Sequence, residues 1–264
     1  MTTRLAIMGG GNMGAALLNG LLEQQWAPAH ELAVVEVLPA RREQLAARYP
    51  GLVVSASPVA AEAAVLAVKP TDAGAAMRAL VEQGCVRVLS IAAGVTIRTL
   101  EAAAGRPVAV VRAMPNTPAL VGAGVAAIAA GTHAGDADLA WAESILRAVG
   151  TVERVPEDQL DAVTGLTGSG PAYVFLFAEA LIEAGVLVGL SRAASRAMVT
   201  QLLVGSAKLL TDSGELPEVL RANVTSPAGT TAAGLRALER AGMRAAVLDA
   251  VVAATERARE LGRE

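Results

Sequence analysis

The sequence predicts an α/β domain built on a parallel sheet, followed by an all-α domain. In the first part of the chain, short β-rich runs alternate with Ala/Leu patterns of helical period. After about Pro156 no further strand pattern occurs and only helical spacing remains. Hydrophobic residues make up 53% and charged residues 18% of the 264 residues, which is typical of a globular protein and not of a disordered one.

The predicted strands are short, continuous apolar runs, as expected when helices cover both faces of a parallel sheet. Two later runs, 124–130 and 151–155, could extend that sheet. The five main strands are expected at 4–8, 32–37, 63–68, 86–92 and 108–113, and the helices of this part at 12–25, 39–48, 71–82 and 137–148.

The second part of the chain carries three long helical patterns and three short ones. We therefore divide the chain into domains 1–157 and 158–264. The long helices are expected at 170–189, 192–212 and 242–261, and the short ones at 158–164, 215–221 and 230–240.

The helix expected at 170–189 is apolar on nearly all sides, with Glu179 and Glu183 as its two charges. Such a helix must be buried on several sides. A second copy of the domain could cover it, which predicts a homodimer through this half. A dense monomeric bundle is the alternative.

Composition excludes several function classes. Aromatic residues are 2% of the chain and the net charge is -3, so neither base stacking nor a basic surface for nucleic acid is expected. Cys85 is the single cysteine and is expected in the core, without a disulfide. His30 and His133 are too few and too far apart to indicate a metal site, so no metal is expected.

The segment 5–22 is uncharged and could be taken for a signal peptide or a membrane span. Its centre, however, holds four glycines and Asn12, where an apolar helix would carry leucine. A strand, a glycine turn and a helix explain it better. Since we find no other candidate span, we expect a soluble cytoplasmic protein that does not associate with membranes.

The glycine turn itself fits the pattern G-x-G-x-x-G over residues 9–14. It follows an expected strand and opens an expected helix, which is the context of a dinucleotide-binding turn. The glycines would allow the tight turn, the approach of a pyrophosphate and close helix packing. A purely structural turn is the alternative.

The choice between NAD and NADP stays open. Glu36 ends the second expected strand, where an acidic group accepts from the ribose hydroxyls of NAD and repels the 2′-phosphate of NADP. Arg41 and Arg42 follow closely and could reach a phosphate, or could simply form a solvated helix face.

Several motifs occur together in a characteristic order: IMGGGNMG, LAVKP, SIAAGVTI, RAMPNTPALVGAG, TGSGPAYVF and NVTSPAGTT. This set closely resembles the pyrroline-5-carboxylate reductase family over nearly the whole chain. The resemblance implies a Rossmann-type domain, a helical dimerisation domain, and often larger assemblies of dimers. It also implies reduction of 1-pyrroline-5-carboxylate to L-proline by NADH or NADPH.

The same resemblance implies roles for individual residues. Thr231 is our candidate catalytic residue, acting on the ring nitrogen or the carboxylate by orientation and not as an acid. The implied substrate-binding residues are Glu157, Ser226, Gly229, Thr230 and Thr231. The implied cofactor-binding residues are Gly9, Gly11, Asn12, Met13, Gly14, Glu36, Ala67, Val68, Lys69, Pro70, Ile91, Ala92, Ala93 and Asn223.

One departure from the family pattern concerns the backbone. The family usually carries two glycines after Pro227, whereas this chain has Ala228 in the first of these positions. If that position needs a positive φ, alanine strains it or shifts the loop. No polar group is lost.

The expected chemistry needs no nucleophile, because a protonated imine is already electrophilic and the rate would come from placement against the nicotinamide. Lys69 could donate a proton, or could only precede Pro70 in an extended backbone. A hydroxyacid dehydrogenase is disfavoured because the helical half holds a single lysine, Lys208, and no histidine. A cofactor-binding sensor without turnover is a second alternative.

The segment SPAGTTAAGL, residues 226–235, reads as a helix start with free backbone amides and two threonines. This arrangement suits a small carboxylate. If the helical domains pair, we expect this loop to face the cofactor of the neighbouring subunit.

Overall fold

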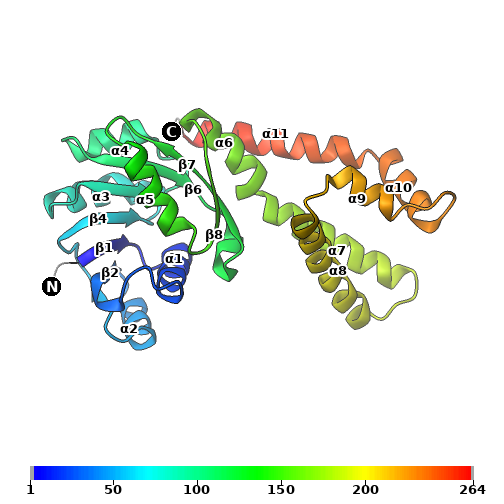
Figure 1. Cartoon of the computed structure of the whole chain (residues 1–264), viewed down its shortest axis with the longest axis horizontal. Helices are drawn as coiled ribbons and strands as arrows, with labels where there is room; N and C mark the ends of the chain where they lie inside the picture. The colour runs from blue at the N-terminus through cyan, green and yellow to red at the C-terminus, as the bar shows by residue number, and fades with distance from the viewer. Residues whose placement is uncertain (1–2, 263–264) are drawn as a thin grey trace. The chain divides into compact units, whose positions relative to one another are not determined.

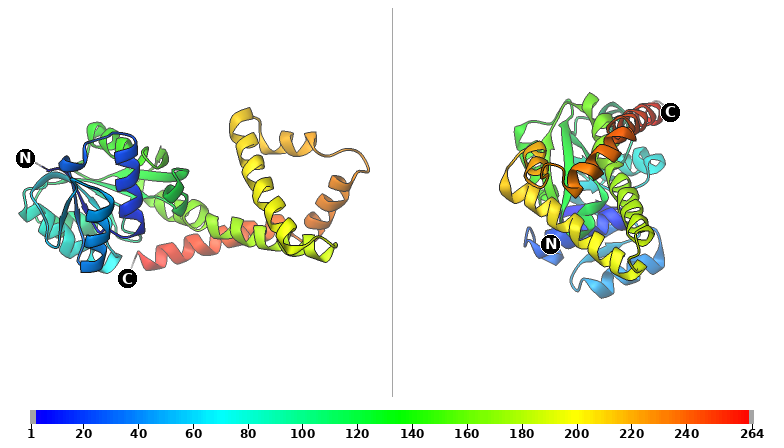
Figure 2. Two further views of the ribbon diagram at one scale, coloured as in Figure 1. Left: turned by 90° about the horizontal axis from the view of Figure 1, so that it is seen from below. Right: turned by 90° about the vertical axis from the view of Figure 1, so that its right-hand side faces the viewer.

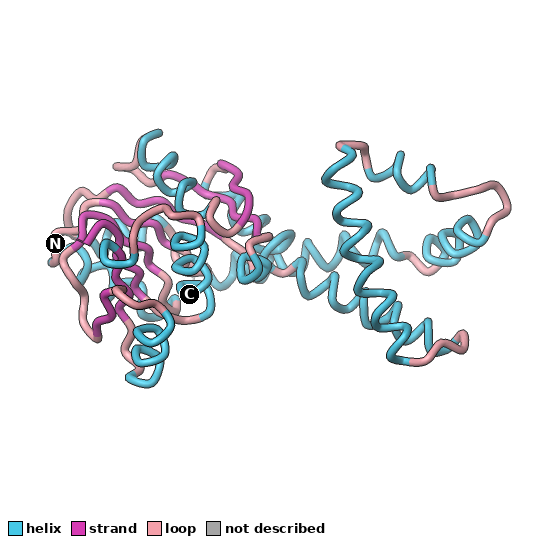
Figure 3. The backbone as a smooth tube through the Cα atoms, turned by 60° about the horizontal axis from the view of Figure 1, so that its bottom comes forward, coloured by secondary structure: helices cyan, strands magenta, loops and turns pink. Residues whose placement is uncertain are grey.

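The computed structural model describes residues 3–262, which form two compact units. The sheet unit comprises Met1–Ser169 and Ala253–Glu264, and the helical unit comprises Gly170–Val252. All the strands of the described chain lie in the sheet unit, while the helical unit contains only helices and connecting loops (Figure 3). The prediction of an α/β part followed by an all-α part is confirmed.

The sheet unit is built on one eight-stranded sheet in the order β3-β2-β1-β4-β5-β6-β7-β8 (Figure 1). The chain pairs β1 with both β2 and β4 in parallel, so the strand order reverses beside β1. The strands are β1 Thr3–Met8, β2 Leu32–Val35, β3 Val53–Ser55, β4 Ala61–Leu66, β5 Arg87–Ser90, β6 Ala109–Met114, β7 Gly124–Ala130 and β8 Gly150–Arg154.

Helices cover both faces of this sheet, and the core is accordingly divided in two. Leucines of α1, α2 and α5 pack with Leu5 and Ile7 on one face. Residues of α3, α4 and α6 pack with Ala6 and Leu66 on the other. These helices are α1 Asn12–Glu23, α2 Pro39–Arg48, α3 Ala73–Glu82, α4 Ile97–Ala104, α5 Asp136–Leu146 and α6 Leu160–Val163.

Cys85 belongs to the second of these cores and is 1% exposed, which confirms its expected core position. Burial raises the pKa of its thiol, and a smaller backbone hydrogen-bond effect at Arg87 acts in the opposite direction. A thiol whose charged form is disfavoured is a poor nucleophile. Its role is packing.

The sequence prediction missed two elements, β3 and α4. Strand β3 has three residues at the sheet edge, too few to show a periodic pattern. Helix α4 has eight residues, yet its ends carry clear signals: the Thr96 side chain accepts from Thr99 N, and Gly105 ends the helix with a φ of 66°. Thr96 and Gly105 could therefore have revealed α4.

The sheet departs from the predicted parallel arrangement at one strand pair. Strand β7 runs antiparallel to β6, with Met114 opposite Ala127. The connection between them holds only the 3₁₀ helix η3, Thr117–Val121, and lacks the crossover helix that a parallel pair would need. Strand β8 then pairs in parallel with β7.

The helical unit contains α7 Gly170–Leu187, α8 Arg192–Ser213, α9 Pro217–Asn223, α10 Thr230–Arg240 and the first part of α11, Met243–Leu261. Helices α7 and α8 contact each other across a short turn (Figure 2). Ser195 Oγ donates to the Ile182 carbonyl oxygen at 2.8 Å, and a Cβ on Gly185 would lie 2.2 Å from that hydroxyl. Small residues thus allow the close approach of the two helices.

Two segments of the chain are apolar enough to be considered as membrane spans, residues 5–22 and Glu157–Leu187. Residues 5–22 form β1, the glycine turn and most of α1, as predicted. By length and composition alone, Glu157–Leu187 could span a bilayer, with a mean hydropathy of 1.5. The expectation that no second candidate span exists is therefore wrong, because the apolar face of α7 passes the same test.

Candidate active site

The glycine turn between β1 and α1 is imposed by backbone packing. Gly9 has a φ of +107°, and a Cβ there would lie 2.4 Å from the carbonyl oxygen of Ala67. A Cβ on Gly14 would lie 2.0 Å from the carbonyl oxygen of Gly9. Both distances are shorter than any real contact, so only glycine allows β1, β4 and α1 to meet this closely.

Gly11 is different, because a Cβ there would meet no atom within 4 Å. It is the N-cap of α1, and no side chain caps the helix. The first amides of a helix have no partner within the helix, so those of Asn12 and Met13 are available to an anion. Open space at the residue where the backbone must approach a pyrophosphate fits a bound dinucleotide.

The remaining predicted cofactor residues of the sheet unit follow the carboxyl ends of β4 and β5. Ala67 N donates to the Met8 carbonyl oxygen at 2.8 Å, and Ile91 N to that of Leu66 at 3.0 Å. The strand order reverses between β1 and β4, where open α/β sheets bind their ligands. The structure therefore gathers at this crevice the glycine turn and the loops holding Ala67, Val68, Lys69, Pro70, Ile91, Ala92 and Ala93.

Lys69 has an extended backbone, with a ψ of 149°, and precedes the short 3₁₀ helix Pro70–Asp72. This is the conformation that a following proline favours. The extended backbone of Lys69 is thus explained by the proline that follows it.

Glu36 directly follows β2 and is 8% exposed. Its Oε2 accepts from Gly10 N at 3.0 Å and its Oε1 from Leu38 N at 2.9 Å. Arg41 Nε donates to the Gly10 carbonyl oxygen at 2.8 Å. The Glu36 carboxylate therefore holds the amide of Gly10, and the Arg41 guanidinium holds its carbonyl oxygen.

Arg112 is a buried charge that the sequence analysis did not single out. Its side chain is 8% exposed, and NH1 lies 3.0 Å from Glu157 Oε1. Asp161 Oδ1 lies 3.9 Å from NH2. The signal that could have found it is a charge within the apolar strand VAVVRAM, since buried charges require partners.

Glu157 has further bonds within the sheet unit. The same Oε1 accepts from Ile97 N at 2.7 Å, at the first residue of α4. Glu157 therefore joins β6, α4 and the segment that leads into α6. The loop before α4 holds Ile91, Ala92 and Ala93, so this carboxylate also anchors the end of a predicted cofactor loop.

Asn116, in the MPNTP motif, has a structural role. Its Oδ1 accepts from Val125 N at 3.0 Å and its Nδ2 donates to the Thr167 carbonyl oxygen at 3.1 Å. Thr167 lies in a π-helical turn, Thr164–Gly168, between α6 and α7. Such π-helical turns are rare inside helices and often occur beside functional sites.

The predicted substrate segment lies in the helical unit. Thr230 and Thr231 are the first residues of α10, whose N-cap is Gly229 without a side-chain cap. A Cβ on Gly229 would lie 2.2 Å from Ser226 Oγ, so a side chain there would have to displace the Ser226 hydroxyl. The free amides and two hydroxyls form a small polar group at a helix N-terminus, and Asn223 ends α9 just before this loop.

Ala228 adopts a φ of +58°, one of two non-glycine residues with positive φ in the described chain. The position does need the left-handed conformation, as the departure from the family pattern suggested. An alanine there carries strain that glycine would not.

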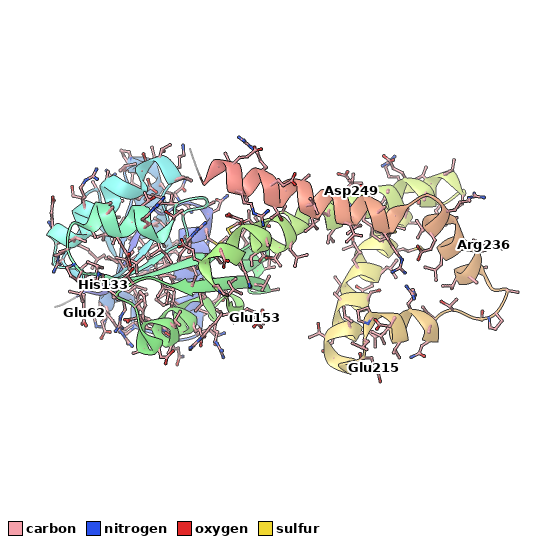
Figure 4. All side chains as sticks on the ribbon, turned by 90° about the horizontal axis from the view of Figure 1, so that it is seen from above. Glu62, His133, Glu153, Glu215, Arg236 and Asp249 are labelled. Carbon is pink, nitrogen blue, oxygen red and sulfur yellow. The ribbon has the colours of Figure 1, made fainter. Side chains whose placement is uncertain are left out.

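Within residues 3–262, the structure gathers no group of three His, Cys, Asp or Glu side chains that could hold a metal ion. His133 and Glu62, labelled on the sheet unit in Figure 4, lie at its surface.

A parallel sheet with a glycine turn at its switch point, followed by an all-α unit, defines the class of nicotinamide dinucleotide-binding oxidoreductases with a helical C-terminal domain. Comparison with known proteins agrees. The profile described as NADP oxidoreductase, coenzyme F420-dependent, matches residues 4–94. The profile for pyrroline-5-carboxylate reductase dimerisation matches residues 157–261.

Full-length relatives define the family. Pyrroline-5-carboxylate reductase of Synechocystis is 43% identical over 100% of both chains. That of Mycobacterium tuberculosis is 44% identical over 98% of this chain and 96% of its own. The Coxiella burnetii reductase structure superposes with a TM-score of 0.93 at 33% identity over 99% of each chain. This chain belongs to the pyrroline-5-carboxylate reductase family.

A second solved structure concerns the cofactor. Plasmodium falciparum pyrroline carboxylate reductase, with NADP bound, has a TM-score of 0.85 at 32% identity over 98% of both chains. Together with the match to an NADP oxidoreductase profile, this supports an NAD(P) cofactor for this chain.

Proposed function

We propose that this protein reduces 1-pyrroline-5-carboxylate to L-proline, the last step of proline biosynthesis, with NADH or NADPH as the reductant. The observation that carries the proposal is the glycine turn, closed to any side chain at Gly9 and Gly14 and open at Gly11. Full-length identity of 43% to a reductase of this family supports the choice of substrate.

The residues of the sheet unit would bind and orient the cofactor. The amides after Gly11 would hold the pyrophosphate at the N-terminus of α1, and Glu36 would meet the adenine-side ribose. The loops at Ala67–Pro70 and Ile91–Ala93 would line the crevice towards the nicotinamide. When bound, the reduced nicotinamide supplies the hydride.

The helical unit would hold the substrate. The amides around Ser226–Gly229, with Thr230 and Thr231, suit the single carboxylate of the imine, because helix N-termini and hydroxyls donate to anions. The imine enters protonated, so hydride adds to its carbon, the C=N bond becomes C–N, and the electron pair stays on nitrogen. The side chains of this site then need to orient the imine and need not donate a proton.

Glu157 was expected at the substrate. Its Oε1 already accepts from Arg112 and Ile97, and its side chain is 33% exposed. We propose that Glu157 acts on the substrate side through its remaining acceptor capacity while it holds the loop of Ile91–Ala93 in place.

The proposal divides the work between a cofactor-binding domain, residues 1–157, and a substrate-binding and dimerisation domain, residues 158–264. The family match over 157–261 supports association through the helical half. We propose a homodimer, able to form larger assemblies of dimers, that is cytoplasmic and binds neither nucleic acid nor membranes. The apolar surface of α7 would then be covered by a second copy of the chain.

The test is a kinetic assay. Purified protein is mixed with 1-pyrroline-5-carboxylate and NADH or NADPH, and oxidation is followed by the loss of near-ultraviolet nicotinamide absorbance, with L-proline measured as product. Stoichiometric proline formation is expected. Tight cofactor binding with no oxidation would favour the alternative of a sensor.

A hydroxyacid dehydrogenase is the second enzyme candidate, and the helical unit disfavours it. Such enzymes need a base for the alcohol proton, and the one lysine of this unit, Lys208, is 74% exposed and paired with Asp212. The same assay with short 2-hydroxy acids and oxidised cofactor is expected to show no reaction.

A further inference from the structure

We propose that this enzyme uses NADH in preference to NADPH, and that Glu36 makes the choice. The inference rests on the proposed function, which leaves both cofactors open. The residue concerned is Glu36 of this chain, and a Plasmodium relative at 32% identity has been solved with NADP bound.

The first step of the argument is the place of Glu36. It follows β2, the strand next to β1 on the side where a dinucleotide extends its adenine half. The carboxylate reaches back to the glycine turn, since Oε2 lies 3.0 Å from Gly10 N. A ribose seated beside this turn therefore meets Glu36 directly.

The second step is that this carboxylate is held in place. Gly10 N and Leu38 N each donate to a different oxygen, so rotation of the side chain would break both bonds. A Cβ on Gly10 would lie 2.7 Å from Leu45 Cδ1 and 3.2 Å from Glu36 Oε2, which shows how closely the turn, α2 and the acid are packed. With 8% exposure, Glu36 has little room to move away from a 2′-phosphate.

The third step concerns the two arginines that could have received that phosphate. Arg42 NH1 donates to the carbonyl oxygens of Glu36 and Val37, at 2.8 and 2.9 Å. Arg41 Nε donates to the Gly10 carbonyl oxygen and its NH1 to Gln44 Oε1. Each guanidinium group therefore uses part of its donors to hold the turn or the end of β2.

The acceptor oxygens of Glu36 favour the two free ribose hydroxyls of NADH over the 2′-phosphate of NADPH. Each carboxylate oxygen keeps a lone pair after accepting one amide, and ribose hydroxyls are donors that can use it. A 2′-phosphate offers no donor when ionised and places like charge against a fixed acid in a partly buried site, where screening is weak. A bound NADPH would have to place its 2′-phosphate against the fixed Glu36 carboxylate.

The experiment compares the two cofactors on the unmodified protein. Dissociation constants for NADH and NADPH are measured by nucleotide fluorescence without substrate, and kcat/KM for each in the reductase assay. We expect both measures to favour NADH by about tenfold or more. Equal values, or a preference for NADPH, would overturn the inference and leave the proposed function intact.

The variant Glu36→Gln tests the residue itself. It removes the charge and one of the two acceptors, so NADH is expected to bind more weakly. Loss of the like charge relieves the repulsion of the 2′-phosphate, so the NADH/NADPH preference is expected to fall about fivefold or more. Glu43→Gln is the matched control, because Glu43 lies exposed on the same helix as Arg41 and Arg42, and its ratio is expected to stay unchanged. An unchanged ratio in Glu36→Gln contradicts the assignment.

The double variant Arg41→Gln, Arg42→Gln separates charge attraction from the effect of Glu36. If the arginines only hold the turn, both cofactors lose affinity together and the ratio changes less than about threefold. A loss confined to NADPH would show that they read the phosphate and would refute the inference. If no variant or wild type turns over, the proposed function fails, and the two dissociation constants still decide the preference.

Discussion

The two units of this protein differ in how far each completes its own core. The largest fully buried side chains, Leu5 to Ile128, all belong to the sheet unit. In the helical unit, Ser195 and Val199 are the buried residues of the described chain, and α7 has none. The sheet unit can thus be stable alone, whereas the helical unit leaves apolar area that association would remove from water.

The exposed residues of the helical unit make the point concrete. Phe175 is 63% exposed, Leu176 66% and Leu187 86%. Charged groups of the same unit, labelled in Figure 4, lie elsewhere: Arg236 on α10, Asp249 on α11 and Glu215 in the connection between α8 and α9. A contiguous exposed apolar surface of this kind marks a site of association.

The largest effect is expected from a variant that prevents association through the helical unit. The double variant Phe175→Glu, Leu202→Glu introduces two charges into exposed apolar positions of α7 and α8 and is expected to give monomers in sedimentation. We expect kcat/KM to fall about a hundredfold or more, because a misplaced substrate site costs that much. The cofactor dissociation constant should stay within about twofold, since the sheet unit has its own core.

The control for this pair is Gln201→Glu, a single added charge at an exposed polar position beside Leu202. It is expected to keep the wild-type assembly and activity. A fully active monomer of the double variant would refute the link between association and catalysis.

The second prediction compares two glycines of the sheet unit. Gly14→Ala places a Cβ 2.0 Å from the Gly9 carbonyl oxygen, so we expect a loss of about 3 kcal/mol of stability and of cofactor binding. Gly11→Ala meets no atom and has an ordinary φ of -65°, so the melting temperature should not change. Its cofactor dissociation constant should rise about tenfold, because the methyl group occupies the approach of the pyrophosphate.

Thermal unfolding and cofactor titration of both variants separate fold from binding. If Gly11→Ala binds the cofactor as tightly as the wild type, the pyrophosphate does not approach the turn there.

The third prediction concerns the charge cluster inside the sheet unit. Glu157→Gln leaves the buried Arg112 with Asp161 at 3.9 Å as its remaining counter-charge. We expect a loss of about 2 kcal/mol in urea unfolding at fixed chain concentration. Asp158→Asn, at the exposed neighbouring position, should cost less than about 0.5 kcal/mol; an equal effect of both would mean that the ion pair contributes little.

The fourth prediction returns to the helical unit. Thr231→Ala removes a hydroxyl from the N-terminus of α10 and should lower kcat/KM about tenfold, equivalent to about 1.4 kcal/mol. Circular dichroism and the cofactor dissociation constant should match the wild type, since the residue lies outside the sheet unit. Wild-type kinetics in this variant would remove Thr231 from the catalytic site.

The smallest expected effect is a gain. Ala228→Gly relieves a left-handed alanine and should stabilise the protein by about 0.5 kcal/mol, because the relieved strain exceeds the added freedom of the unfolded chain. Gln25→Gly, at the other positive φ, in the sheet unit, is the matched comparison and should gain a similar amount. A loss in Ala228→Gly alone would mean that the alanine methyl group makes a contact that glycine cannot replace.

Local sequence signals predicted most elements because each is set by nearby residues. The helices 39–48 and 230–240 and the strand 124–130 match the structure residue for residue. The glycine turn was also readable, since its pattern, the preceding strand and the following helix are adjacent in sequence. Elements of few residues, such as β3, gave too little pattern to detect.

The sequence by itself determined the order of elements, the class of fold and the glycine turn, because propensity and backbone sterics act over a few residues. Only the tertiary structure decided that β7 runs antiparallel, that Arg112 meets Glu157, and that Glu36 reaches back to Gly10. These contacts join residues far apart along the chain, whose pairing depends on how the sheet is assembled and leaves no periodic trace in the sequence.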